Sequence, residues 1–165
     1  MMTIIAFVAI ALLVLSDQLI KIWALENLRG ELPLEFIKFG DKPIINLNYL
    51  ENRGAAFGSF SGNVIILVGL TALMILLAMG YLILNKKNSK LLTATLSLII
   101  AGGIGNLIDR IARGFVVDYI EIKLFRFAVF NFADMCIVIG AVLLVLYVIF
   151  IDKESTKSKY PKRRL

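Results

Sequence analysis

The sequence predicts an all-α membrane protein, in which four transmembrane helices carry a small extracytoplasmic β-sheet between helices 1 and 2. Three observations lead to this fold class. First, 59% of the 165 residues are hydrophobic and the mean hydropathy is +0.87, whereas soluble domains rarely exceed half apolar. Second, four apolar stretches each approach the roughly 20 helical residues that cross a bilayer. Third, the basic residues gather in segments that would lie on one side of the membrane.

The four predicted spans cover about residues 3–23, 64–84, 91–111 and 132–151. The second span has no charged residue, and the other three carry their charges near one end. The first span could be mistaken for a cleavable signal peptide. It lacks a basic N-terminal region and a small-residue cleavage site, and three further spans follow it. We therefore expect it to be a retained helix.

The distribution of Lys and Arg predicts the orientation of the spans. The connection 85–90 holds three lysines and no acid, and the tail 152–165 holds six basic residues against two acids. The segment 24–63 holds four basic and five acidic residues. Because basic segments remain in the cytoplasm, we expect both termini to be cytoplasmic and segment 24–63 to be extracytoplasmic. Residues 1–151 then form a single membrane-embedded domain with a basic cytoplasmic tail.

The extracytoplasmic segment contains the predicted sheet. Residues 35–50 mix β-branched and aromatic side chains and alternate in polarity at 45–49, which is typical of strands. Gly40-Asp41-Lys42-Pro43 supplies a turn signal between two short strands. We expect these strands to lie on the outer membrane surface.

The charged residues of the spans, and one acid in the loop before the fourth, fall at the extracytoplasmic ends of the helices. An ionisable group inside a membrane costs several kcal/mol unless it is paired or hydrated, so each is a candidate functional residue. Asn106, a polar residue of the third span close to Asp109 and Arg110, is included with them. The candidates are Asp17, Lys21, Asn106, Asp109, Arg110, Asp118 and Asp134.

Part of this cluster has a structural explanation. Asp17 and Lys21 stand four residues apart, which places them on one helix face, so a salt bridge explains them at least as well as direct chemistry. Asn106 and Arg110 share a face for the same reason. Asp109 lies off that face and would serve as a cap or a bridge. Arg110 has two possible partners, Asp109 or another neighbouring carboxylate.

Asp118 and Asp134 have no basic residue at helical spacing. If they face each other across a partly hydrated pocket, repulsion and burial would keep one carboxyl protonated near neutral pH while the other stays charged. That arrangement is what an aspartic hydrolase requires. The charged carboxylate takes a proton from water, and the neutral one donates to the scissile carbonyl oxygen.

The composition excludes several other chemistries. The chain has no histidine and a single cysteine, Cys136, so Ser-His and Cys-His pairs, histidine metal ligands and an intramolecular disulfide are ruled out. We expect Cys136 to be a buried apolar side chain. We expect no metal and no cofactor. The net charge of +6 follows the predicted topology, so nucleic-acid binding is not expected.

Five blocks of the sequence resemble the lipoprotein signal peptidase family, also called signal peptidase II. They lie in the family's order and extend over most of the chain. The blocks are Asp17-Gln18-Leu19-Ile20-Lys21, Asn52-Arg53-Gly54-Ala55-Ala56-Phe57-Gly58, Gly102-Gly103-Ile104-Gly105-Asn106-Leu107-Ile108-Asp109-Arg110, Val116-Val117-Asp118-Tyr119-Ile120 and Phe130-Asn131-Phe132-Ala133-Asp134.

The resemblance implies a metal-free aspartic endopeptidase of the bacterial cytoplasmic membrane. Its substrates would be prolipoproteins carrying diacylglycerol on a cysteine, cut just before that cysteine near the extracytoplasmic face. Its partners would then be these substrates and membrane lipids, and we expect a monomer. Phe57 and Tyr119 stand where many relatives have Trp and Phe, and both keep an aromatic ring.

The resemblance also gives roles to the residues of the blocks. Asp118 and Asp134 take the catalytic positions. The positions that line or support the site are Asn52, Gly54, Asn106, Arg110, Asn131 and Ala133. Those with a structural role near it are Asp17, Lys21 and Asp109.

Three other classes of function fit the sequence less well. A Ser-Lys peptidase would need a close pair, but Ser16 and Lys21 are five residues apart, and Ser59 and Ser61 have no identifiable base. An ion pathway would place polar groups at several depths, whereas the cytoplasmic halves of the spans carry no charge. A membrane scaffold, whose charges only fix helix packing, is distinguished by substituting the two candidate catalytic aspartates.

Overall fold

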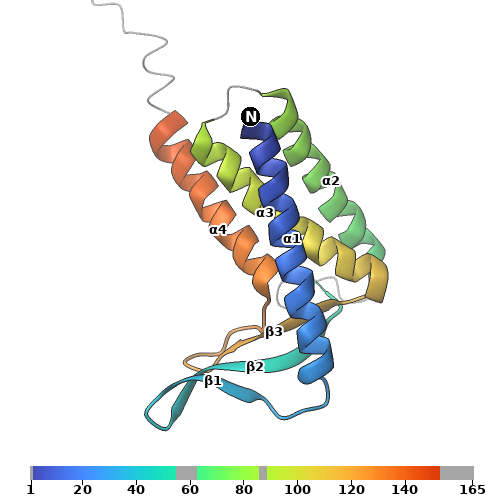
Figure 1. Cartoon of the computed structure of the whole chain (residues 1–165), viewed down its shortest axis with the longest axis vertical. Coiled ribbons are helices and arrows are strands. Elements are labelled where there is room, and N and C mark those ends of the chain that lie inside the picture. The colour runs from blue at the N-terminus through green and yellow to red at the C-terminus, as the bar shows by residue number, and fades with distance from the viewer. Residues whose placement is uncertain (1, 55–62, 86–88, 153–165) are drawn as a thin grey trace, which may run out of the picture.

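The computed structural model describes residues 2–54, 63–85 and 89–152 and contains four helices that are long and apolar enough to cross a membrane. They are α1 (Met2–Asn27), α2 (Val64–Leu84), α3 (Lys90–Arg113) and α4 (Phe132–Leu146), which the short helix η2 (Tyr147–Asp152) continues. Figure 1 shows the four helices as a bundle with a small sheet at the end opposite to the N-terminus of α1. The predicted fold class, four apolar helices with a small β-sheet, is confirmed, and α1 and α3 extend a few residues beyond their predicted spans.

Helix α3 forms the centre of the bundle. In its most apolar stretch 61% of the residues are buried inside the protein, against 6% for α2 and 17% each for α1 and α4. The buried cluster at its middle includes Leu96 and Ile100 together with Ile10 of α1 and Ile75 of α2. The outer surfaces of the other three helices are apolar and exposed, as lipid-facing surfaces are.

Three antiparallel strands form the sheet, in the order β1 (Leu34–Phe39), β2 (Lys42–Asn52) and β3 (Val116–Ile122). The two predicted strands are present, and Gly40 makes the turn between them with a φ of +60°. The third strand was not predicted, because residues 116–122 were expected to be a loop. They pair with β2 in a register that sets Asp118 opposite Leu50, and so this part of the chain joins the sheet.

Local sequence signals set the ends of α3. The Ser89 hydroxyl oxygen accepts a hydrogen bond of 3.1 Å from the Leu92 N–H at the start of the helix, as an N-cap does. The helix ends at Arg113 and is followed by the C-cap residue Gly114, whose φ of +78° is left-handed and whose N–H donates to the Arg110 carbonyl. This turn directs the chain from α3 into β3.

Several features of the sequence analysis lie outside the described residues. They are Lys86 and Lys87 of the basic connection, the block positions Ala55, Ala56, Phe57 and Gly58, the serines Ser59 and Ser61, and the tail from residue 153 onward.

Candidate active site

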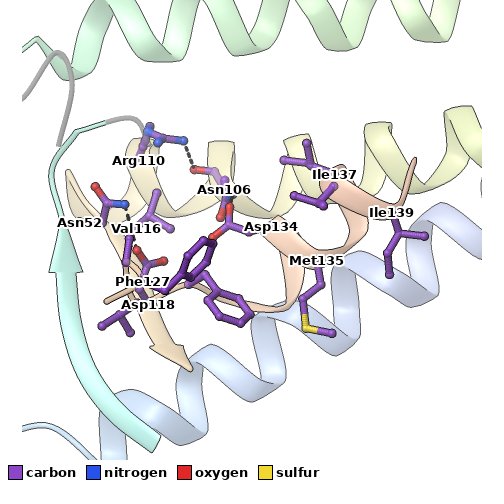
Figure 2. Close-up of a pocket in the computed structure, with 14 residues that line it drawn as sticks. Asn52, Asn106, Arg110, Val116, Asp118, Phe127, Asp134, Met135, Ile137 and Ile139 are labelled. Carbon is purple, nitrogen blue, oxygen red and sulfur yellow. Dashed lines mark hydrogen bonds between the residues drawn. The ribbon is translucent and has the colours of Figure 1, made fainter. Parts of the chain in front are cut away.

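A cavity of about 630 Å³ lies where the sheet meets the helix bundle. Its polar side chains come from four elements that are distant in sequence, and Figure 2 shows them gathered at one end of it. The rest of the lining is apolar and includes Phe127 and residues of α4 such as Met135 and Ile139. The polar lining residues are Asn52, Asn106, Arg110, Asp118 and Asp134.

Asp118 enters this cavity from strand β3. Its side chain is buried, and its two carboxylate oxygens accept hydrogen bonds from Asn52 Nδ2 at 2.9 Å and from Asn131 Nδ2 at 2.6 Å. Burial, followed by the nearby charge of Asp134, raises the pKa of Asp118 to about 7, although the two amide donors act in the opposite direction. Near neutral pH this carboxyl is therefore divided between its protonated and charged forms.

Asp134 is held by the start of helix α4. Asn131 is the N-cap residue, and its Oδ1 accepts from the Asp134 N–H at 2.9 Å, while Asp134 Oδ2 accepts from the Asn131 N–H at 3.2 Å. This reciprocal arrangement is a capping box, for which the spacing of three residues is typical. The second carboxylate oxygen, Oδ1, accepts from Asn106 Nδ2 at 2.7 Å. One carboxylate thus caps the helix and lines the cavity.

Two asparagine side chains connect the two carboxylates. Asn131 Nδ2 donates to Asp118 Oδ1 and, at 3.2 Å, to Asn106 Oδ1. Asn106 Nδ2 in turn donates to Asp134. Both asparagines are buried. The result is a continuous chain of amide hydrogen bonds from one aspartate to the other.

Arg110 places a positive charge on the same cavity. Its guanidinium donates to the Gly54 carbonyl at 3.0 Å and to the Asn106 carbonyl at 3.4 Å, and Gly54 is held by an N–H bond to Asn52 Oδ1 at 3.0 Å. One of the partners left open for Arg110 was Asp109. Within the residues that the structure describes, the hydrogen bonds of Arg110 go to carbonyls and not to Asp109 or another carboxylate. Its side chain lines the cavity (Figure 2).

Asp109 has other partners. Its carboxylate lies 3.1 Å from Lys21 Nζ and 2.5 Å from Arg113 Nη1, and it accepts from the Val117 N–H at 3.0 Å. Neighbouring residues on a helix point about 100° apart, whereas residues four apart share a face. The i,i+4 spacing therefore favours Arg113 over Arg110. This spacing is present in the sequence and could have indicated the pair of Asp109 and Arg113.

Asp17 and Lys21 complete a buried charged cluster beside the cavity. Lys21 Nζ lies 2.9 Å from Asp17 Oδ2, at the i,i+4 spacing noted in the sequence. Both side chains are buried. Gln18, which the sequence analysis did not single out, donates to the Gly105 carbonyl at 3.1 Å and links α1 to α3 in this layer.

Small residues allow this layer to pack. Asp17 Oδ1 accepts from the Ala133 N–H at 3.0 Å. A Cβ atom placed on Gly105 would lie 2.5 Å from Asp17 Oδ2, and one on Gly102 would collide with the Ala133 carbonyl oxygen. These two glycines therefore allow α1 and the start of α4 to lie close against α3.

Tyr119 is a second residue whose contribution the sequence analysis missed. Its hydroxyl oxygen accepts from the Phe132 N–H at 3.2 Å, at the first residue of α4. Tyr119 is buried, and burial raises the pKa of its phenol. The hydroxyl thus satisfies one of the free amides at the helix start. A sequence pattern gives no signal for this contact, because the two residues belong to different elements.

The alternative Ser-Lys pair does not form between Ser16 and Lys21. The Ser16 hydroxyl donates to the Leu12 carbonyl of its own helix at 2.9 Å and is exposed. Lys21 is instead enclosed by Asp17, Asp109 and Asn106. The two remaining serines of that hypothesis lie outside the described residues.

Comparisons with known proteins agree on one family. A family model described as "Signal peptidase (SPase) II" matches residues 9–150. The chain is 41% identical to a lipoprotein signal peptidase of Clostridium tetani over 145 residues, which are 86% of this chain and 90% of the relative. It is also 41% identical to one of Clostridioides difficile over 153 residues, which are 88% and 95% of the two chains.

The fold has a solved counterpart. A structure of a bacterial membrane enzyme superposes with a TM-score of 0.80 at 26% sequence identity, over 97% of this chain and 94% of the other. The residues matched by the family model include all of the polar lining of the cavity and the buried charged cluster beside it.

Proposed function

The chain belongs to the signal peptidase II family, and from this premise we propose that it is an aspartic endopeptidase acting on diacylglyceryl-modified prolipoproteins. As a member of this family it is a multi-pass membrane protein and a protease that removes signal peptides from prolipoproteins. The bond cleaved is the one before the lipidated cysteine. One observation carries the aspartic mechanism: Asp118 and Asp134 line the same cavity and are joined by neutral amides.

The pair can hold one proton near neutral pH. The pKa of Asp118 is about 7 because the side chain is buried and Asp134 lies nearby, and two interacting carboxyls titrate as a unit. The charged member takes a proton from a water molecule, which attacks the scissile carbonyl carbon. The neutral member gives its proton to the carbonyl oxygen. When the C–N bond breaks, the proton taken from water passes to the leaving amine, and the other aspartate takes back the proton that it gave to the carbonyl oxygen.

The other polar lining residues suit the task of holding the peptide backbone. Arg110 and Asn52 donate hydrogen bonds and lie on the cavity surface beside the pair. A fixed positive guanidinium stabilises negative charge that develops on a carbonyl oxygen. We expect these residues to orient the scissile bond, with Asn106, Asn131, Gly54 and Ala133 supporting them.

The apolar part of the cavity suits a lipid-modified substrate. It extends from the aspartates along the exposed side of α4 past Met135 and Val138. An acyl chain or an apolar signal peptide gains free energy by covering such a surface. Polar chemistry at one end and an apolar wall at the other match a substrate whose scissile bond lies close to its lipid anchor.

We place the active site at the extracytoplasmic face, with both termini in the cytoplasm. The cavity lies at the sheet end of the bundle, whereas the start of α1 and the end of α4 lie at the opposite end (Figure 1). The basic residues of the chain concentrate in the segments that join or follow the helices at that opposite end. This orientation gives the aspartates access to water and to a lipid anchor in the outer leaflet.

The direct test is to replace each aspartate by its neutral isostere. Asp118→Asn and Asp134→Asn should each lower the cleavage rate of a diacylglyceryl-modified precursor peptide by about 10²–10⁴-fold, the usual contribution of general acid-base catalysis. Asp41→Asn, at an exposed turn of the sheet, is the matched control and should cleave at the unaltered rate.

Each variant is reconstituted in lipid nanodiscs, and its thermal unfolding is recorded beside its activity. Cleavage retained in either Asp118→Asn or Asp134→Asn rejects the aspartate pair. Loss of folding in both, with activity per folded molecule unchanged, supports the scaffold interpretation instead.

A further inference from the structure

Lys21 is an unusual side chain for a membrane-embedded bundle, because it is fully buried and its ammonium is surrounded by oxygen atoms. Nζ lies 2.9 Å from Asp17 Oδ2, 3.1 Å from Asp109 Oδ2 and 2.9 Å from Asn106 Oδ1. An ammonium carries three N–H donors and no acceptor. These three contacts therefore use every donor that Lys21 has.

The third contact links the charged cluster to the aspartate pair. Two carboxylates are enough to balance the charge of Lys21, yet it also donates to the neutral amide oxygen of Asn106. That amide is the group whose Nδ2 donates to Asp134 Oδ1 at 2.7 Å. One side chain thus separates the buried ammonium from the carboxylate that lines the cavity.

We propose that Lys21 is a positioning residue for the aspartate pair, which fixes the Asn106 side chain in the amide orientation that donates to Asp134. The inference rests on the proposed function of Asp118 and Asp134 and goes beyond it, because it gives Lys21 a role in the reaction rather than in helix packing alone.

The two ends of the Asn106 amide differ in hydrogen bonding, because the oxygen accepts and the nitrogen donates. The oxygen and nitrogen of an asparagine side chain have nearly the same shape, so packing alone does not select between its two orientations. In the alternative orientation, Nδ2 would face the Lys21 ammonium, donor against donor. Oδ1 would then face the Asp134 carboxylate, acceptor against acceptor. Lys21 removes that orientation because it offers donors only.

A second donor to Asn106 Oδ1 is weaker. Asn131 Nδ2 reaches this oxygen at 3.2 Å and also donates to Asp118 at 2.6 Å. The bond from Lys21 is shorter and carries a full charge, and charge-assisted hydrogen bonds are roughly twice as strong as neutral ones. Lys21 is therefore the stronger of the two groups that orient Asn106.

Lys21 acts through Asn106 and not on the substrate. Within the described residues, its hydrogen bonds and ion pairs go to neither Asp118 nor Asp134, and it is not among the residues that line the cavity. Its positive charge also acts on Asp118, where it opposes the rise in pKa that burial causes. Substitution of Asn106 leaves that charge in place, so the two effects are separable.

The test needs a variant that does not leave a buried charge unbalanced. In Asp17→Asn/Lys21→Met one negative and one positive charge are removed together, and Asp109 keeps Arg113 as its partner. Asp17→Asn alone is the reference. In Asp17→Asn/Lys21→Gln the new amide has both a donor and an acceptor, so it favours the Asn106 orientation less strongly than Lys21 does.

We measure kcat and KM of the full chain in lipid nanodiscs, with a diacylglyceryl-modified precursor peptide as substrate. Relative to Asp17→Asn, the Met variant should lose at least about tenfold in kcat with KM changed by less than about threefold. The kcat of Asp17→Asn/Lys21→Gln should lie between the kcat of Asp17→Asn and that of Asp17→Asn/Lys21→Met. Equal kcat in the Met variant and the reference overturns the proposal.

A double-mutant cycle separates positioning through Asn106 from a general structural effect. Asn106→Ala should lower kcat by at least about tenfold in the otherwise unaltered enzyme, but by less than about threefold in the Asp17→Asn/Lys21→Met background. The same loss in both backgrounds overturns the proposal. If the Met variant does not fold, the Gln variant replaces it, and a kcat equal to the reference overturns the proposal in the same way.

Asp118→Asn is assayed in parallel to keep the two proposals apart. Cleavage by Asp118→Asn means that the aspartic mechanism fails, whatever the Lys21 variants do. No cleavage by Asp118→Asn, together with full activity of the Met variant, means that only the role of Lys21 fails.

Discussion

Four aspartates lie in one layer where the sheet meets the helices, and their neighbours separate them into two pairs. Asp17 and Asp109 contact cationic groups, namely Lys21 and, for Asp109, Arg113 as well. Asp118 and Asp134 accept their hydrogen bonds from neutral amides. A cation favours the charged form of a carboxyl, whereas burial among neutral groups disfavours it. The same side chain therefore suits charge balance in one pair and proton transfer in the other.

The sequence singled out Asp118 and Asp134 more clearly than it indicated the partners of Asp17 and Asp109. Asp118 and Asp134 stand out because no basic residue lies at helical spacing from either. The contact of Lys21 with Asp109 joins α1 to α3 over 88 positions of sequence, and no local pattern indicates it. The bond from Lys21 to Asn106 is hidden for the same reason.

Tyr119 leads to a prediction about stability. Replacing Tyr119 by Phe leaves the Phe132 N–H at the start of α4 without its acceptor, and a buried unsatisfied donor costs about 1–3 kcal/mol. We expect Tyr119→Phe to lower the free energy of unfolding by that amount in detergent denaturation, while cleavage stays within about threefold. Cleavage is retained because the aromatic ring at position 119 still occupies the same space and Asn131 still caps α4.

Tyr81→Phe is the matched control, because the Tyr81 side chain lies on the exposed surface of α2. This variant should have the same free energy of unfolding in detergent denaturation as the unaltered protein. Equal stability of Tyr119→Phe and Tyr81→Phe would show that the hydroxyl of Tyr119 contributes nothing.

At the scale of elements, the helices were predictable and the third strand was not. The helices extend over long apolar stretches, and Ser89 and Gly114 mark the ends of α3 as local signals do. Strand β3 is seven residues long and pairs with β2, which lies more than 60 residues earlier. The alternation of polar and apolar residues in this segment was too short to distinguish a strand from an apolar loop. The pairing sets Asp118 beside β2, where Asn52 reaches it.

The close approach of α1 and α3 leads to a prediction about packing. In Gly105→Ala the new methyl group would lie 2.5 Å from Asp17 Oδ2 and 3.2 Å from Ala133 Cβ. The helices must then move apart, and overpacking of this kind costs about 1–3 kcal/mol. We expect a lower unfolding temperature in nanodiscs and a lower cleavage rate, because the layer that holds Asp134 shifts.

Gly80→Ala in α2 is the control, since a Cβ there meets nothing within 4 Å. It receives the same gain in helix propensity, up to about 1 kcal/mol, without the collision. The account of the packing is wrong if Gly105→Ala is as stable as Gly80→Ala.

At the scale of the whole molecule, lipid as solvent explains why the hydropathy of the sequence predicted the four helices. Helix α2 is only 6% buried over its most apolar stretch, and its outer side chains are large and apolar. In water such a surface would be costly, whereas in a bilayer it is neutral. The position of the cavity could not be predicted in this way, because it depends on how the sheet closes over the ends of α3 and α4.

The central claim is that Asp118 and Asp134 share one proton near neutral pH in a single cavity. The most direct measurement is the titration of the Asp118 carboxyl carbon by NMR in ¹³C-aspartate-labelled enzyme, with Asp118→Asn used to assign the signal. We predict a midpoint of about 7 rather than the ordinary 3.8. In Asp134→Asn the midpoint should fall, because the neighbouring negative charge that raises it is gone. A midpoint near 4 that Asp134→Asn leaves unchanged would contradict the account.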